Sequence, residues 1–269
     1  MKNPEELKIV VKETYGKIAS QSRTQNASSC CGSGSGCGCS DDAVMAEEYG
    51  HLDGYVPEAD LGLGCGIPTD GAGIKSGDTV LDLGSGAGND VFVARRIVGE
   101  HGRVIGVDFT EEMIAKANAN KQKLGYANVG FRMGDIEQLP VDTSSVDVVI
   151  SNCVLNLVPD KTKAFAEISR VLKPGGHFSI SDIVVTAPLP EKLKTVAELY
   201  AGCVSGAMVR SEYLSIIESA GFRNIRLVKE KPIQIPAEAL AEYLSDVERA
   251  AYNDSNVRIQ SITVMAEKP

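Results

Sequence analysis

A carboxylate and three closely spaced glycines occupy the point where an apolar strand meets a helix. Residues 79–83 form a short apolar run typical of a buried parallel strand, and residues 91–98 have helical spacing. Asp82 lies in the strand, and the turn has glycine at every second position: Gly84, Gly86 and Gly88. Glycine allows a sharp backbone turn and a close approach to a ligand. The order strand, glycine turn, helix predicts a nucleotide-binding crevice at the carboxyl end of the strand.

The spacing of this turn argues against a dinucleotide. The dehydrogenase pattern requires a third glycine five places after the first, where this chain has Asn89. With Ser85 between its first two glycines, the loop instead resembles motif I of class I methyltransferases, which use S-adenosylmethionine. That ligand has an amino group that Asp82 can attract directly or through water. The alternative for these residues alone is a turn that binds no ligand.

Two further strands end in acids. Asp108 comes 20 residues after Gly88, at the end of the strand 102–108, where an acid accepts hydrogen bonds from ribose hydroxyls. Met113, in the following helix, contacts either the adenine or the core. Asp135 and Ile136 follow the strand 129–133 and are expected beside the adenine, the alternative for Asp135 being a solvated turn. Acids at the ends of three successive strands predict a methyltransferase core.

Three single cysteines are predicted to meet at the same edge of the sheet. Cys65 precedes the first strand, Cys153 ends the fourth and Cys203 follows the fifth. Asn152, just before Cys153, is expected to contact the cofactor. Any one of these cysteines can be a small buried hydrophobe, although the glycines flanking Cys65 argue against its burial in a strand. Together, three thiolates suit a soft three-coordinate centre such as trivalent arsenic, whose lone pair can attack a sulfonium methyl.

Four more cysteines lie in residues 22–40, a segment rich in serine and glycine: Cys30, Cys31, Cys37 and Cys39. This composition cannot bury a core, and we expect a mobile strap that binds a soft ion or relays electrons. Zinc is an alternative, but the spacing is not that of paired Cys-x-x-Cys knuckles. The other alternative is a disordered segment without function.

These motifs together resemble the arsenite methyltransferases. The resemblance covers roughly residues 10 to 210 and is carried by short blocks: Tyr15-Gly16, Ser28 to Cys31, Leu63 to Gly66, Asp82 to Asp90, Ser151 to Lys161, Arg170 to Gly176, Ser181 to Val184 and Gly202 to Ala207. The Ser-Asn-Cys-Val block at 151–154 is quite specific, whereas the glycine loop is shared with many relatives. We find no matching site motif in residues 211–269, so the resemblance leaves the number of methyl groups open.

The resemblance implies a thiolate-held substrate. Cys153 and Cys203 would hold arsenic during methylation. Cys65 would bind arsenic with them or enter the disulfide formed during turnover, and Cys30 or Cys31 would be the amino-terminal partner that is oxidised and reduced again. Arsenite would arrive as a thiol complex, for example with glutathione, and leave methylated, which would detoxify it. S-adenosylmethionine would be the cofactor, with thioredoxin or glutathione as reductant and no metal cofactor.

The elements that must position these residues predict an α/β fold. We expect a doubly wound, mostly parallel, Rossmann-like sheet of seven strands, with an amino-terminal extension and a small carboxyl-terminal cap. Residues 1–60 would hold a helix and the strap, 61–185 the cofactor core, and 186–269 the arsenic-site cap and the sheet edge. The first helix, to about residue 21, would present Leu7, Val10, Val11, Thr14 and Ile18 on one face. A helix over 237–249 and an alternating antiparallel edge strand over 257–266 would end the fold.

The composition of the chain limits the classes of molecule that we expect it to bind. The chain of 269 residues has a net charge of -9 and no basic stripe, which argues against a nucleic-acid substrate. No apolar run reaches the roughly 18 residues of a membrane helix, and the charged start is unlike a signal peptide. We therefore expect a cytoplasmic protein, and we predict a monomer. The rival functions are a quinone-type C- or O-methyltransferase, in which Cys153 and Cys203 are dispensable, and a thiol-based arsenic or metal binder without catalysis.

Overall fold

The fold is built around one central β-sheet. The computed structural model describes residues 4–21, 47–189, 192, 206–235, 237, 240–241, 244–255 and 257–269. Seven strands follow the order β3-β2-β1-β4-β5-β8-β7, and the two-residue β6 also pairs with β5. The strands are β1 (Thr79–Leu83), β2 (Arg103–Asp108), β3 (Val129–Met133), β4 (Val146–Asn152), β5 (Leu172–Val185), β6 (Met208–Val209), β7 (Arg223–Ile233) and β8 (Ile259–Glu267). The strands β1 to β5 are parallel, and β8 runs antiparallel to β5 and β7, as the methyltransferase resemblance predicts.

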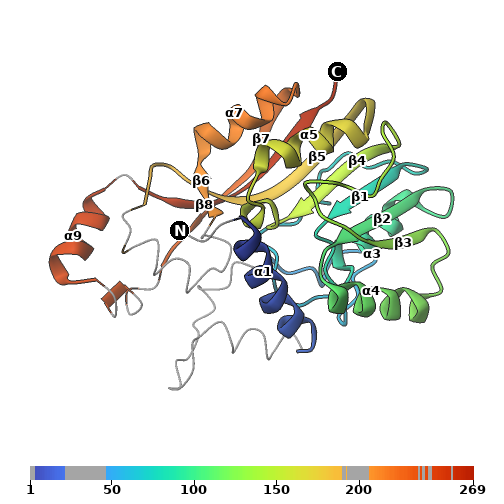
Figure 1. Cartoon of the computed structure of the whole chain (residues 1–269), viewed down its shortest axis with the longest axis horizontal. Helices are drawn as coiled ribbons and strands as arrows, with labels where there is room; N and C mark the ends of the chain where they lie inside the picture. The colour runs from blue at the N-terminus through green and yellow to red at the C-terminus, as the bar shows by residue number, and fades with distance from the viewer. Residues whose placement is uncertain are drawn as a thin grey trace.

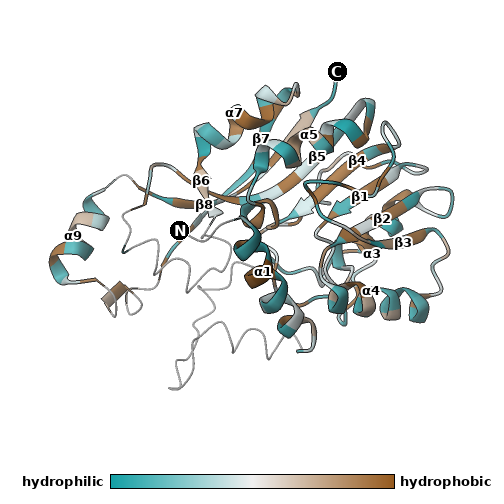
Figure 2. Cartoon of the chain, in the orientation of Figure 1, coloured by the Kyte–Doolittle hydropathy of each residue, from teal (hydrophilic) through white to brown (hydrophobic). Residues whose placement is uncertain are grey.

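Helices cover both faces of this sheet (Figure 1). The helices that pack on its faces are α3 (Asn89–Val98), α4 (Glu111–Leu124), α5 (Lys161–Val171) and α7 (Arg210–Ser219). The structure also has α1 (Pro4–Ala19), α9 (Asp246–Asp254) and a short 3-10 turn η2 (Leu155–Leu157). Alternation in β1 divides the core: Leu81 and Leu83 pack with α5 and α7, and Val80 packs with α3 and α4. Figure 2 shows the matching pattern on the helices, whose ribbons alternate between hydrophobic and hydrophilic residues.

Helix α1 lies against α4 and faces the carboxyl ends of the strands. Of the predicted face, Val11 is buried and Leu7 and Ile18 are half-buried, whereas Val10 is 37% exposed and Thr14 is also exposed, so the prediction was right only in part. The inward stripe is rotated by one residue and includes Tyr15 and Ala19, which pack on the α3–α4 side of the core. Lys8, from the same stripe, reaches two acids beyond β3.

The last two strands differ from the sequence prediction. β8 is not an edge strand, because it lies between β5 and β7 and is buried at every position except its last. The apparent alternation therefore reflected small polar residues that are buried rather than exposed. The predicted helix over 237–249 also ends later: α9 begins after a capping box made by Ser245 and Glu248 and continues to Asp254.

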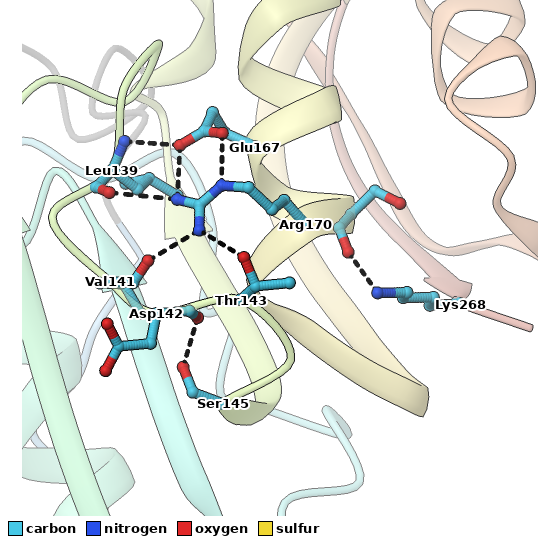
Figure 3. Close-up of polar contacts among 9 residues, drawn as sticks. Leu139, Val141, Asp142, Thr143, Ser145, Glu167, Arg170 and Lys268 are labelled. Carbon is cyan, nitrogen blue, oxygen red and sulfur yellow. Dashed lines mark hydrogen bonds and ion pairs between the residues drawn. The ribbon is translucent and has the colours of Figure 1, made fainter.

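A half-buried arginine clamp fixes the loop between β3 and β4 (Figure 3). Arg170, near the end of α5, pairs with Glu167 at 2.6 Å and donates to the backbone oxygens of Leu139 and Val141 and to Thr143. Glu167 in turn accepts the backbone N–H of Leu139 at 2.7 Å. The clamp therefore holds the loop that begins with two of the predicted adenine-contacting residues.

Candidate functional site

One cavity opens at the carboxyl ends of the parallel strands, where the sequence places its acids. Its wall includes Asp82 and the turn that follows β1. Gly84 and Gly86 have φ angles of +65° and +50°, and a Cβ on Gly84 would meet the Val154 side chain at 2.5 Å. Both positions therefore favour glycine by conformation, and Gly84 is also required by close packing.

Asp108 holds this turn in place. Its two carboxylate oxygens accept the backbone N–H groups of Gly86 at 3.0 Å and Thr110 at 2.8 Å. Burial raises the pKa of Asp108, and these backbone donors partly oppose the rise. The acid thus organises the cavity wall as well as facing the cavity.

Asp135 lines the cavity together with Ile136, but its carboxylate is already engaged. Lys8 Nζ approaches Asp135 at 2.7 Å and Glu137 at 2.8 Å, and these three residues join α1 to the loop after β3. Desolvation of the Lys8 ammonium is the largest single influence and lowers its pKa. The hydrogen bonds and charges of Asp135 and Glu137 together outweigh it, so the pKa of Lys8 is raised. Helix α1 is therefore fastened over the cavity by an ion pair that the sequence analysis did not find.

A network around Asn152 joins the cavity to the cysteine loops. Its Nδ2 donates to the Tyr49 hydroxyl at 2.7 Å, to the Gly66 carbonyl at 2.8 Å and to Asp90 at 3.2 Å. Its Oδ1 accepts the backbone N–H of Cys65 at 3.0 Å. Tyr49 also donates to Asp90 at 2.9 Å. One amide side chain therefore contacts both an acid of the cavity and the loop that carries a thiol.

Cys65 is fully buried, but it lies in a loop and not in a strand, as its flanking glycines predicted. Those glycines make the burial possible. A Cβ on Gly64 would lie 2.6 Å from Asn152, and one on Gly66 would lie 2.6 Å from the hydroxyl of Ser181. The loop is therefore wedged between the ends of β4 and β5, where larger residues would clash.

Cys153 lies in the same buried cluster as Cys65, with Ile183, Val185 and Ile259. Its backbone has a φ of +60°, which is unusual for a residue with a side chain, and its N–H donates to the Ser181 carbonyl at 2.7 Å. Cys153 also lines the cavity. The two thiols thus share one apolar site beside the cavity that the acids surround.

The acids give the cavity an excess of negative charge. Asp82 and Asp90 are 2% and 7% exposed, and after burial itself the nearby charge of Asp90 raises the pKa of Asp82. Burial raises the pKa of Asp82 well above its usual range and that of Asp90 to about 6, the latter despite donors from Asn152 and Tyr49. Such carboxyls favour a cationic ligand, whose charge would relieve both desolvation and mutual repulsion.

The remaining predicted residues lie in different places. Ser85 and Met113 are in the cavity wall, whereas Gly88 is not; it precedes α3 with a φ of +99°, and a Cβ there would meet Phe92 and Phe131. Cys30, Cys31, Cys37, Cys39 and Cys203 lie outside the described residues. In the described part of the chain, no helix is both long and apolar enough to cross a membrane.

Several polar residues of this region escaped the sequence analysis. Asp182 and Tyr213 are buried behind the thiols, and Asp90 is buried in the cavity wall. Asp90 lies inside the glycine-loop motif, so its position was a signal. Asp182 follows the polar residues Ser179 and Ser181 in β5 and belongs to the resemblance block that begins at Ser181, but its residue type and spacing did not mark it as a site residue.

Comparison with known proteins agrees with this geometry. A family model described as a methyltransferase domain matches residues 74–221. An arsenite methyltransferase of Halobacterium salinarum is 41% identical over 100% of this chain and 68% of its own length, and one of Aquipseudomonas alcaligenes is 37% identical over 88% and 68%. A crystal structure of an arsenic(III) S-adenosylmethionine methyltransferase from Chlamydomonas reinhardtii has a TM-score of 0.63 at 37% identity, covering 75% of this chain and 66% of that one. The chain belongs to the arsenite methyltransferase family.

Proposed function

We propose that this enzyme transfers a methyl group from S-adenosylmethionine to trivalent arsenic held by the thiolates of Cys65, Cys153 and Cys203. The observation that carries the proposal is the shared burial of Cys65 and Cys153 in one cluster beside the acidic cavity. Thiolates are soft ligands suited to such a centre. A general small-molecule methyltransferase would not need two thiols at this position.

The cavity suits the cofactor. Its buried carboxyls Asp82 and Asp90 complement a ligand that carries an ammonium and a sulfonium charge. Ser85 Oγ and Asn89 Oδ1 are also buried in this wall, and they have no hydrogen-bond partner within the residues that the structure describes. Buried polar atoms of this kind require a partner, which a polar ligand would supply. When bound, S-adenosylmethionine supplies an electrophilic methyl group.

The ends of the segment that contains Cys203 support its place in the site. Leu189 and Ala207, which flank that segment, both pack against the cluster of Cys65 and Cys153. Gly206 lies so close to η2 that a Cβ on it would be 1.6 Å from the Asn156 oxygen. Cys203 is three residues before Gly206 in the chain, and three residues span at most about 11 Å.

In the proposed reaction the protein aligns its substrates rather than supplying a base. The apolar cluster around Cys65 and Cys153 excludes water from the arsenic, and the left-handed backbone of Cys153 sets the direction of its thiol. The arsenic lone pair carries no proton, so it forms the carbon–arsenic bond directly. The alignment of reacting atoms contributes several kcal/mol to such a step.

Turnover then requires two electrons. Methylation leaves the arsenic formally pentavalent, and two protein thiols can return it to the trivalent state by forming a disulfide. We assign Cys65 and one of Cys30 or Cys31 to this oxidation, with thioredoxin or glutathione restoring the thiols. In this proposal residues 186–269 cap the arsenic, the methylated product is a detoxified form, and the protein acts as a cytoplasmic monomer.

The decisive experiment is methyl transfer from labelled S-adenosylmethionine to arsenite with thioredoxin and glutathione present. The parent should form methylated arsenic, and Cys153→Ser and Cys203→Ser should form none while still binding the cofactor. Cys37→Ser is the matched control, because the proposal gives that cysteine no role. If the parent binds cofactor but methylates no arsenic, or if both variants remain active, the proposal is wrong.

A further inference from the structure

Three polar atoms are buried behind Cys153 with no hydrogen-bond partner among the described residues. They are the two side-chain amide atoms of Asn156, which is 2% exposed, and Oδ1 of Asp182, which is 0% exposed. Leaving such buried atoms unpaired destabilises the folded state. Unpaired buried atoms on two residues that touch each other therefore favour a polar ligand.

These atoms lie next to the proposed arsenic ligands. Asn156 follows Cys153 by three residues in η2, and its backbone N–H approaches the Asp182 carboxyl. Asp182 follows Ser181, whose carbonyl accepts the N–H of Cys153 at 2.7 Å. The segment that carries Cys203 rejoins the described chain at Gly206, against the Asn156 carbonyl. The polar atoms therefore lie where two of the three cysteine-bearing segments meet.

The surroundings supply both donors and acceptors. The Tyr213 hydroxyl donates to Asp182 Oδ2 at 3.1 Å, and Lys161 Nζ donates to the carbonyls of Asn156 at 3.3 Å and Val158 at 3.2 Å. Cys65 and Cys153 are the other titratable groups nearby, since both influence Tyr213. The residues paired with Asp182 and Ser181 across β8 and β4 are uncharged: Ile262, Thr263 and Asn152.

Asp182 is also poised to change its protonation state. Burial raises its pKa to about 7, against the opposing effects of Lys161 and Tyr213. Near neutral pH the carboxyl is therefore divided between a form that donates and a form that accepts a hydrogen bond. This dual character matches a hydroxyl group or a water molecule better than it matches a simple ion.

We propose that Asn156 and Asp182 form a binding subsite for an oxygen ligand of trivalent arsenic, and that Asp182 exchanges a proton with this oxygen when a cysteine replaces it. The inference rests on the proposed function, because it takes Cys153 as an arsenic ligand. It adds a step that precedes methyl transfer: the loading of arsenite onto the thiols.

The loading step balances without an oxidant or a reductant. An arsenic–sulfur bond forms to Cys153 and an arsenic–oxygen bond breaks. The protonated Asp182 gives its proton to the departing oxygen, which leaves as water, and the resulting carboxylate takes the proton of the incoming thiol. Arsenic stays trivalent throughout. A thiol complex of arsenic needs this help less, because its leaving group departs readily as a thiolate.

The test measures how fast the full-length enzyme captures arsenic at pH 7. Parent protein is mixed with arsenite, the reaction is quenched, and protein-bound arsenic is counted by mass spectrometry after gel filtration. Asp182→Asn should slow capture on the order of 100-fold, as loss of a general acid does. Capture from the tris-glutathione complex should slow much less. Ser179→Ala is the matched control, since Ser179 is another buried, unpaired polar residue of β5.

A pH profile separates proton transfer from a structural role. In the parent, arsenite capture should fall as the pH rises through about 7, because Asp182 loses the proton that it donates. Removing Tyr213 or Lys161 raises the pKa of Asp182, so Tyr213→Phe and Lys161→Met should move this limb to higher pH. These variants keep the carboxyl and test the idea even if Asp182→Asn folds poorly.

The outcomes distinguish this inference from the proposed function. If Cys153→Ser captures arsenic as the parent does, the thiol site itself is wrong. If Cys153 is required but Asp182→Asn captures arsenite at the parent rate, only the oxygen subsite is wrong. If the pH profile of arsenite capture does not move in Tyr213→Phe and Lys161→Met, the oxygen subsite is also wrong. Asn156 and Asp182 then have only a structural role.

Discussion

Replacing Asn152 with alanine should weaken the site on both sides at once. The change removes the donors to Asp90, Tyr49 and the Gly66 carbonyl, and it leaves the buried N–H of Cys65 without its acceptor. A lost hydrogen bond to a neutral group is worth about 1 kcal/mol, and an orphaned buried donor costs about 1–3 kcal/mol. Because these terms overlap, we expect a loss of about 3 kcal/mol in the free energy of unfolding.

Calorimetry and thiol mapping together test this expectation. At roughly 2–4 °C for each kcal/mol in a chain of this size, the melting temperature should fall by about 6–12 °C. Alkylation followed by mass spectrometry should show Cys65, which is 0% exposed, reacting faster in the variant. Asn118→Ala is the control, since this exposed amide of α4 only donates to a carbonyl one turn earlier. An unchanged melting temperature with Cys65 still protected would refute the reasoning.

Three further changes probe other parts of the structure. The folded-state pKa of Asp182 is raised to about 7 from 3.8, so its stabilising effect is complete at acid pH and is lost as the pH rises through about 7. Asp182→Asn should therefore remove about 4 kcal/mol of the fall in unfolding free energy between about pH 4 and 8, measured by urea titration; an unchanged slope would contradict this. Arg170→Ala should lower the free energy of unfolding by about 2 kcal/mol, because it releases the loop after β3. Lys163→Ala, which removes an exposed ion pair, should lower it by less than about 0.5 kcal/mol. Equal urea midpoints for the two variants would show that the Arg170 clamp does not stabilise the fold. Gly206→Ala forces a Cβ to within 1.6 Å of a carbonyl of η2 and should abolish arsenic capture, whereas Gly130→Ala, which meets nothing within 4 Å, should retain it.

The cofactor side of the fold was predictable because its signals are local. Each acid follows an apolar strand, and parallel strands place their carboxyl ends together, so Asp82, Asp108 and Asp135 were expected in one place. Their partners were not. Lys8 meets Asp135 from 127 positions away, and no period or motif in the sequence records such a distance.

Only part of the cysteine site could be predicted from the sequence. The convergence of the loops followed from the sheet order, and Cys65 and Cys153 do share a cluster. The way in which Cys65 is buried could not be predicted from the sequence, because glycine usually signals a mobile turn, whereas Gly64 and Gly66 allow tight packing here. Asp182 was missed for a related reason: a polar residue in a buried strand is indistinguishable from an exposed one until its neighbours are known.

The position of β8 has a consequence for how this sheet can be completed. β8 follows β7 in the chain yet lies between β7 and β5, so β7 cannot join the sheet before β8 has been made. Until then the long β5, with its buried polar positions, has an open edge able to pair with a strand of another molecule. Slow or interrupted synthesis of residues 257–269 would therefore favour aggregation rather than a smaller active core. A peptide copy of β8 supplied in trans would be the natural remedy for a chain that lacks it.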